Sequence, residues 1–413
     1  MGRIGIENDL TAPGALALQP EQSVDGSGRT LIPGLWDMHA HMWAGAGLMH
    51  LAAGVVNVRD PGSQNEEMPR LMSRQQRGEI AGPRIHPSGF IEGRSPFSAR
   101  FGFVVDSVDK GLAAVDWYAA HGYHAIKLYN SIKPEWVKPL AARAKLLGLH
   151  VHGHVPAFMR AEEAVRAGYD EITHINQVML NFVVRPGDDT RTLTRFTRIG
   201  DDAHALDLTG PKARAFLRLL RERQTAVDPT LMTFESMYTQ AQRQPNPSFA
   251  AIADHLPVLW QRSLGAAEMD LEGARLATYR QSYQRLLDLT LAMHRAGVTL
   301  VAGTDGPEGI GLHRELALYV KAGIPAPEAL RIGTWNGARL AGAGHLRGRI
   351  ARGQAADLVL IDGDPSVDIA DLRKASLVIQ GAVAYEPARL YEAVGFKPFV
   401  RGAALTAGRP TAP

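Results

Sequence analysis

The sequence of 413 residues contains no cysteine. Disulfide bonds, thiolate metal sites and cysteine nucleophiles are therefore excluded. The chain also lacks an apolar stretch long enough to span a bilayer, and its Lys and Arg residues form no basic run interleaved with aromatic residues. Because the net charge is only +3, we expect neither nucleic acid nor a membrane as a partner.

The first seven residues, MGRIGIE, do not have the pattern of a signal peptide. We therefore expect a cytoplasmic protein. A periplasmic or secreted protein whose signal has been removed is the alternative, and the lack of cysteine fits either compartment.

The chain length suits a barrel of typical size together with a smaller domain. Turn-rich segments with alternating polarity occur at both ends, namely ALQPEQSVDGSGRTLIPG near the start and GRIARGQAADLVLIDGDP and LVIQGAVAYE near the end. We predict that residues 1–33 and 341–413 build a small β-sandwich domain, and that residues 34–340 form the barrel.

Eight short apolar or β-branched runs recur along the chain, separated by helix-like segments that several times end in glycine. The runs cover residues 35–41, 55–60, 84–90, 124–129, 149–155, 171–176, 225–231 and 299–305. Alternating strands and helices predict a parallel α/β fold, and eight units favour a closed (β/α)₈ TIM-like barrel over an open doubly wound sheet. Residues 177–224 and 232–295 interrupt the spacing, and we interpret them as insertions that form either a lid or additional packing.

Six polar side chains lie at or near the carboxyl ends of these predicted strands, where barrel enzymes carry their catalytic residues. They are His39, His41, Lys127, His152, His174 and Asp305. His39 and His41 point to the same side, because side chains alternate along a strand. Lys127 lies in an apolar run, AIKLY, where an unpaired ammonium group is costly, so it needs an anionic partner or a changed chemical state. A single histidine on a strand is usually structural, but the joint pattern indicates a metal site.

The motif LIPGLWDMHAHMW resembles the first-strand signature of the amidohydrolase superfamily. The resemblance extends over almost the whole chain and is strongest to a binuclear branch containing imidazolonepropionase-like proteins, Xaa-Pro and Xaa-Arg dipeptidases and ochratoxin-degrading amidases. GVVNVRDPG and EALRIGTWNGARLAG also resemble that branch. The resemblance implies two metal ions with these ligands: His39, His41 and Asp305 on the more buried ion, His152 and His174 on the more exposed ion, and a carboxylated Lys127 bridging both.

His152 and His154 share one face of the fifth predicted strand, so their order at the metal is open. The resemblance favours His152 as the ligand, and His154, with Tyr129, then contacts the substrate or its carbonyl oxygen. By position in the loops after strands three and eight, the candidates for binding a substrate carboxylate are Arg94, His313 and Arg314, although each also suits a solvated surface.

The resemblance implies hydrolysis of an amide bond in a dipeptide, an N-acyl amino acid or an ochratoxin-type amide by water that two metal ions activate. The nitrogen and oxygen donors suit Zn²⁺, with Mn²⁺ or Co²⁺ as alternatives. Asp305 is the expected proton carrier and therefore a catalytic residue. A lactonase, esterase or phosphotriesterase with the same metal centre is the first alternative. A deaminase is disfavoured, because Val155 stands where the resemblance would require Glu. A non-catalytic scaffold is the remaining alternative, and the resemblance also implies a homo-oligomer.

Overall fold

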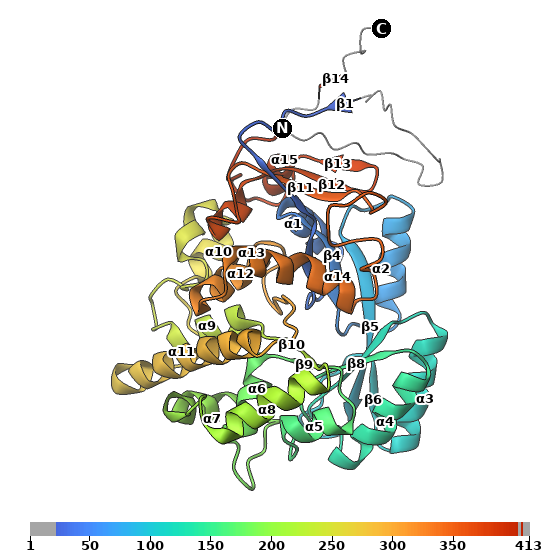
Figure 1. The fold of residues 1–413 in the computed structure, drawn as a ribbon, viewed down its shortest axis with the longest axis vertical. Helices are drawn as coiled ribbons and strands as arrows, with labels where there is room; N and C mark the ends of the chain where they lie inside the picture. Colours follow the sequence, from blue (N-terminus) through green and yellow to red (C-terminus); the bar gives the residue numbers. More distant parts are fainter. Residues whose placement is uncertain (1–21, 404–405, 408–413) are drawn as a thin grey trace.

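The computed structural model describes residues 22–403 and 406–407 and has an α/β architecture (Figure 1). Its centre is a parallel sheet that curls into half of a barrel, with strand order β3-β4-β5-β7-β8. The strands are β3 (Leu35–Asp37), β4 (Val55–Asp60), β5 (Arg84–Gly93), β7 (Ala125–Leu128) and β8 (His150–Gly153), and β6 (Phe103–Val105) pairs with the end of β5. The prediction of parallel strands separated by helices is confirmed for this part of the fold.

A second parallel ladder joins β9 (Glu171–Thr173) to β10 (Ala226–Asp228). Few backbone hydrogen bonds connect it to its surroundings. Asp170 donates to Val151 of β8 over 2.9 Å. On the other side Val227 donates to Thr299 over 2.9 Å and accepts from Val301 over 3.1 Å. The predicted eighth run, residues 299–305, forms an isolated bridge at Leu300 instead of an assigned strand. It still lies beside the first strand, because Met38 donates to Ala302 over 2.8 Å.

The strands are buried on both faces because helices cover the outside of the sheet. All six residues of β4 are buried, including the polar ones. The connecting helices between β3 and β9 are α1 (Ala46–Ala52), α2 (Glu67–Gln76), α3 (Val108–Ala120), α4 (Pro134–Leu146) and α5 (Ala161–Ala167). Helix α4 starts with a proline, whose missing N–H costs nothing in the first turn. Helix α5 ends at Gly168 in the left-handed conformation, with φ 118°, as the helix–glycine–strand pattern predicts.

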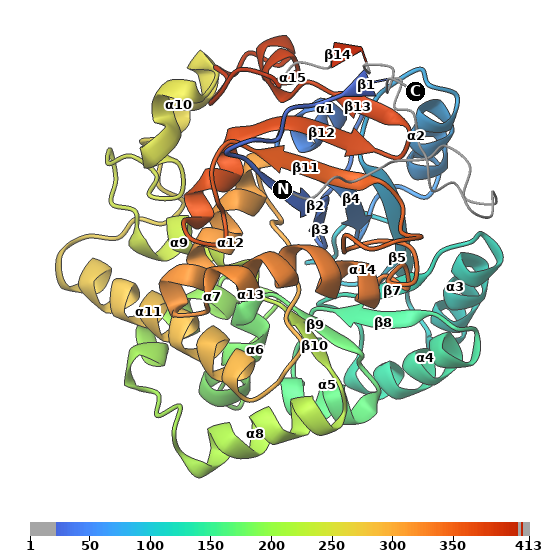
Figure 2. The same cartoon turned by 45° about the horizontal axis from the view of Figure 1, so that its top comes forward.

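Helical insertions follow β9 and β10, and Figure 2 shows them on one side of the molecule, in green and yellow. The first comprises α6 (Ile175–Val183), α7 (Thr194–Asp202), the 3₁₀ turn at Ala203–Ala205 and α8 (Pro211–Glu222). The second comprises α9 (Leu231–Thr239), the 3₁₀ segment Ala250–His255, α10 (Val258–Ser263) and α11 (Gly273–Arg295). Helix α11 packs against α7 and α9, so the two insertions support each other. The predicted strand runs that end at residues 176 and 231 are shorter than expected, because α6 and α9 begin inside them.

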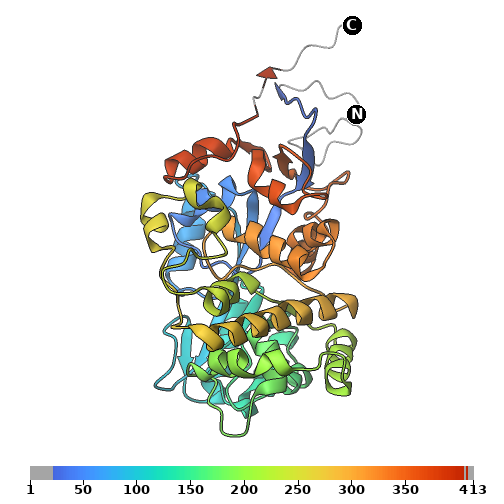
Figure 3. The ribbon, with the colours of Figure 1, turned by 90° about the vertical axis from the view of Figure 1, so that its left-hand side faces the viewer.

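Both chain ends contribute to one antiparallel sheet with the order β13-β12-β11-β2. Its strands are β2 (Thr30–Pro33), β11 (Asp357–Ile361), β12 (Ala375–Gln380) and β13 (Val383–Tyr385). A separate pair joins β1 (Gln22–Ser23) to β14 (Thr406–Ala407). Figure 3 shows the blue N-terminal and red C-terminal segments together at one end of the molecule. The expected β unit thus includes a single four-stranded sheet from both ends; residues 1–21, part of that prediction, lie outside the described residues.

Short helices connect the barrel region to this sheet. They are α12 (Ile310–Ala322), α13 (Ala326–Arg331), the π-helical turn Ile332–Asn336, α14 (Gly337–Leu340), the 3₁₀ segment Ile369–Lys374 and α15 (Pro387–Ala393). Among the described residues, no helix combines the length and apolar character needed to cross a bilayer.

Candidate metal centre

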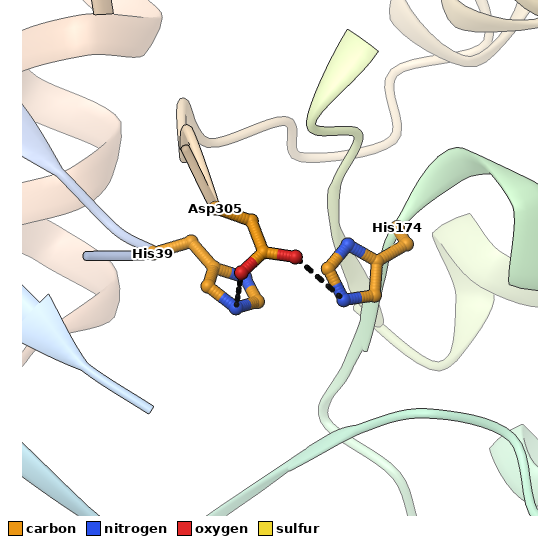
Figure 4. Close-up of side chains that lie close together, drawn as sticks. All are labelled: His39, His174 and Asp305. Atoms are coloured by element: carbon orange, nitrogen blue, oxygen red, sulfur yellow. Dashed lines mark ion pairs between the residues drawn. The ribbon is translucent and has the colours of Figure 1, made fainter. Parts of the chain in front are cut away.

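Three of the predicted ligands converge beyond the carboxyl ends of the parallel strands (Figure 4). His39 follows β3, His174 directly follows β9, and Asp305 follows the segment that bridges to β10. One ligand atom from each residue lies within 4.8 Å of the other two. The carboxylate of Asp305 lies between the imidazoles, with Oδ1 3.4 Å from Nε2 of His39 and Oδ2 3.7 Å from Nε2 of His174.

His41 and Lys127 extend this cluster. Nε2 of His41 is 3.3 Å from Oδ1 of Asp305, and Nζ of Lys127 is 3.2 Å from Nε2 of His39. Lys127 is buried on β7, as the apolar run around it predicts. The structure therefore brings five of the six predicted ligands into one chain of contacts.

Hydrogen bonds to the far side of each imidazole orient the rings. Nδ1 of His39 is 2.9 Å from Oδ2 of Asp228, and Nδ1 of His174 is 2.8 Å from Oγ1 of Thr230. Nδ1 of His41 donates to the carbonyl of Gly62 over 3.0 Å. With Nδ1 occupied in this way, Nε2 of each ring faces the cluster and can offer a lone pair to a metal ion.

His152 lies within β8, and His154 directly follows the end of that strand. His152 is fully buried in register with Lys127; its Nε2 lies 2.8 Å from Oγ of Ser88, and its Nδ1 makes a long contact of 3.4 Å with Oγ1 of Thr173. The ring of His154 lies 4.6 Å from that of His174, and its Nδ1 is 2.8 Å from Oδ1 of Asn130. His154 is thus next to the cluster, while both ring nitrogens of His152 contact hydroxyl groups, those of Ser88 and Thr173. The assignment of His152 as ligand stays a prediction.

Tyr129, the other residue expected to contact the substrate, lies beside His154. Its ring centroid is 4.1 Å from that of His154 and 4.9 Å from that of Phe90. Nζ of Lys127 is 5.5 Å from the centre of the Tyr129 ring. Tyr129 and His154 therefore form one wall of the site.

The three residues expected to bind a substrate carboxylate do not join the cluster. Arg94 is exposed and lies 3.9 Å from Asp106. His313 is buried, with Nε2 2.8 Å from the carbonyl oxygen of Ala53. Arg314 pairs with the buried Glu235 over 2.6 Å.

Two buried carboxyl groups behind the cluster were not predicted as part of the site. Asp37 accepts hydrogen bonds from the backbone N–H of His39 over 3.0 Å and from Oγ1 of Thr304 over 2.8 Å. Burial raises the pKa of Asp37 to about 7, against the effect of these bonds. The other is Asp228, the partner of His39. An acidic residue in a buried strand, as in LWDMHAH and TAVDPTL, was the signal that could have identified both.

Three non-glycine residues at the ends of the last strands have positive φ angles: 72° at His174, 48° at Thr230 and 47° at Asp305. Such conformations cost about 1–3 kcal/mol each and persist where surrounding structure enforces them, frequently at functional sites. Here they turn two candidate ligands toward each other.

The charges of the cluster fit a divalent cation. Burial lowers the pKa of Lys127 to about 8. Although burial favours its protonated form, the pKa of Asp305 is lowered to about 2 by its contact with His41 and by the positive charges that His174, Lys127 and His41 place around it when no metal ion is bound. Imidazole nitrogen and carboxylate oxygen are donors that suit Zn²⁺, Mn²⁺ or Co²⁺. The residues present therefore match the group that the sequence predicts.

The amidohydrolase family model matches residues 273–384. A search of curated protein sequences finds no significant match.

Solved structures give broader matches. A bottromycin amidohydrolase shares 21% identity with a TM-score of 0.68, covering 90% of this chain and 82% of that chain. A Xaa-Pro dipeptidase with bound methionine shares 20% identity with a TM-score of 0.60, covering 87% of each chain. The A. niger ochratoxinase shares 18% identity with a TM-score of 0.59, covering 86% of this chain and 83% of that chain. These structures share the fold of this chain, and with the match over residues 273–384 they agree with the resemblance to the amidohydrolase superfamily that the sequence shows.

Proposed function

We propose that the protein is a binuclear metal-dependent amidohydrolase that hydrolyses an amide bond of a small molecule. In this proposal the two parallel ladders and residues 299–305 form one closed eight-stranded barrel, and the sheet from the chain ends belongs to a small β-sandwich. The observation that carries the proposal is the convergence of His39, His174 and Asp305, each turned inward at a strand end.

The proposal assigns the ligands as the sequence predicts: His39, His41 and Asp305 for one ion, His152 and His174 for the other, and a carboxylated Lys127 between them. Carboxylation suits Lys127, because its lowered pKa supplies the neutral amine that adds carbon dioxide. The product is an anionic oxygen ligand, which removes the cost of a buried ammonium group.

Divalent ions held here would lower the pKa of water and polarise a carbonyl oxygen. Asp305 takes the proton from the attacking water and returns it to the leaving amine, because its carboxylate lies centrally in the cluster and stays ionised. His154 and Tyr129 line the neighbouring wall, where they orient the carbonyl group of the substrate. The substrate class is a dipeptide, an N-acyl amino acid or an ochratoxin-type amide, which the dipeptidase and ochratoxinase among the structural neighbours support.

A substrate panel tests this function. Protein reconstituted with Zn²⁺, Mn²⁺ or Co²⁺ in bicarbonate buffer is assayed with dipeptides, N-acetyl amino acids, lactones and paraoxon. Release of amines from the amides supports the proposal. Turnover of lactones or paraoxon alone would replace it with the lactonase or phosphotriesterase alternative. Less than one bound ion per chain would favour a scaffold.

Replacement of Asp305 tests its proton role. Asp305→Asn should lower kcat by about 10²–10⁴-fold, because an amide cannot carry the proton. Circular dichroism and the unfolding temperature should show that the fold survives. His255→Ala, a substitution outside the cluster, is the control and should retain full turnover. Normal turnover by Asp305→Asn would exclude the proton role.

A further inference from the structure

Four arginines lie between residues 185 and 198 of the first insertion, and three of them pair with aspartates. Arg185 is 2.7 Å from Asp202. Arg191 is 2.7 Å from Asp189, and Arg198 is 2.8 Å from Asp188. The fourth, Arg195, forms no ion pair with any carboxylate in the described part of the chain. Arg195 is therefore a half-buried cation of this segment that is available to an anionic ligand.

A series of aromatic rings connects Arg195 to the candidate site. Its guanidinium group lies 4.6 Å from the centre of the Phe196 ring. The ring of Phe196 is 6.4 Å from that of Phe234, which in turn is 6.4 Å from the ring of His174. Helix α7, which carries Arg195, packs against α6, which begins directly after His174.

The electrostatic influence of Arg195 on residues of the candidate site agrees with this arrangement. Burial is the largest influence on the pKa of Tyr129, which it raises, and on those of His154 and His174, which it lowers. The positive charge of Arg195 acts on all three groups and lowers the pKa of each. Arg195 is therefore the cation of the insertion whose field reaches both His154 and His174.

We propose that Arg195 binds the free carboxylate of the substrate and makes the protein selective for N-acyl amino acids or dipeptides over neutral amides. A planar guanidinium group binds a carboxylate through two parallel hydrogen bonds, and such charge-assisted bonds are stronger than neutral ones. The proposal rests on the proposed amide hydrolysis and assigns a carboxylate anchor that Arg94, His313 and Arg314 do not supply, given their other contacts.

Aromatic side chains at the mouth guide the choice of probe. Phe101 is exposed, and its ring lies 6.4 Å from that of His41 and 6.0 Å from that of Phe90. An aromatic amino acid suits such a surface. The probes are N-acetyl-L-phenylalanine, which carries the carboxylate, and N-acetyl-L-phenylalaninol, which has a neutral hydroxymethyl group in its place.

Binding is measured by calorimetry on metal-loaded full-length protein carrying Asp305→Asn, so that slow turnover does not interfere. The acid should bind at least about 10-fold more tightly than the alcohol. Adding Arg195→Gln should weaken binding of the acid about 10- to 100-fold and leave binding of the alcohol unchanged. Adding Arg195→Lys should recover part of the loss, because a point charge replaces the planar fork. Arg185→Gln, which alters an exposed cation of the same insertion, is the matched control and should change neither affinity.

Equal effects of Arg195→Gln on both probes, or equal binding of both by the unsubstituted site, would overturn the inference, as would failure of both to bind. The experiments distinguish failure of this inference from failure of the proposed amide hydrolysis. Hydrolysis of amides without a preference for substrates that carry a carboxylate would exclude the role of Arg195 as carboxylate anchor and leave the proposed hydrolysis intact. Selective binding of the acid without hydrolysis of any amide would retain the anchor and remove the enzyme activity.

Discussion

Glu92, at the end of β5, is a buried carboxyl group outside the metal cluster. Its oxygens accept hydrogen bonds from the backbone N–H groups of Gly93 and Ser131, both over 2.8 Å, and of Ala99 over 3.4 Å. Burial raises its pKa to about 7 in spite of these bonds. The group therefore orders the loop after β5 but binds its proton more tightly in the folded protein than in the unfolded chain.

This shift predicts how stability depends on pH. Between the ordinary pKa of 4.5 and about 7, the folded protein holds a proton that the unfolded chain has released, so Glu92 contributes less stability as pH rises. The loss is at most about 1.4 kcal/mol per pH unit. Urea unfolding at pH 5 and pH 7.5 should show a smaller loss for Glu92→Gln than for the wild type. Identical pH dependence of the two proteins would contradict the prediction.

At the residue scale, the sequence identified the candidate metal ligands better than the residues that surround and orient them. The strand-end positions of His39, His174 and Asp305 follow from strand periodicity, and the structure brings these side chains together. Asp228 could have been found as an acidic residue in an apolar run. Arg195 could not, because its proximity to His174 depends on how α7 packs on α6, and local periodicity carries no information about that contact.

Helices α9 and α12 are tied together by buried charged groups. The carboxylate of Glu315 accepts the backbone N–H groups of Leu231 over 2.9 Å and Met232 over 2.8 Å, in the first turn of α9. Arg314 pairs with Glu235 on α9, and Lys321 lies 3.3 Å from the same carboxylate. Arg314 is thus engaged in holding the second insertion against the barrel.

This contact predicts a structural effect of removing Arg314. Arg314→Ala leaves the buried Glu235 with the more distant Lys321 as its remaining cation, and should lower the free energy of unfolding by about 3 kcal/mol. Arg143→Ala, which removes a more exposed pair with Asp116, should destabilise the protein much less. Urea unfolding measures both. A large rise in KM for an acidic substrate, with stability unchanged, would instead support the carboxylate-binding role expected from the sequence.

At the scale of elements, hydrophobic runs identified where strands begin more reliably than where they end. β4 was predicted with its observed bounds, Val55–Asp60. β9 and β10 end early, because His174 and Thr230 adopt positive φ angles and helices start directly after them. A positive φ at a histidine or threonine contradicts local preference, so tertiary contacts must impose it, and sequence periodicity cannot reveal it.

Across the whole molecule, the cluster joins segments that are far apart in the sequence. His39, His174 and Asp305 lie on three different parts of the barrel, and a bound ion would stabilise the folded state over the unfolded chain. Removal of metal with EDTA should lower the unfolding temperature by roughly 5 °C or more, and adding Zn²⁺ back should restore it.

Differential scanning calorimetry measures this effect of metal removal. The variant His39→Ala should respond much less to EDTA, whereas His255→Ala should respond like the wild type. An unfolding temperature that EDTA does not change in protein shown to contain metal would contradict the prediction.

The antiparallel sheet that unites β2 with β11 has a consequence for biosynthesis. Thr30–Pro33 leaves the ribosome early, whereas Asp357–Ile361 emerges after most of the chain has been translated. During that interval β2 has no partner within this sheet, and its backbone stays available for wrong pairing. Formation of this sheet therefore waits until β11 has been synthesised, and a chaperone that shields the β2 segment during that interval should raise the yield of native protein.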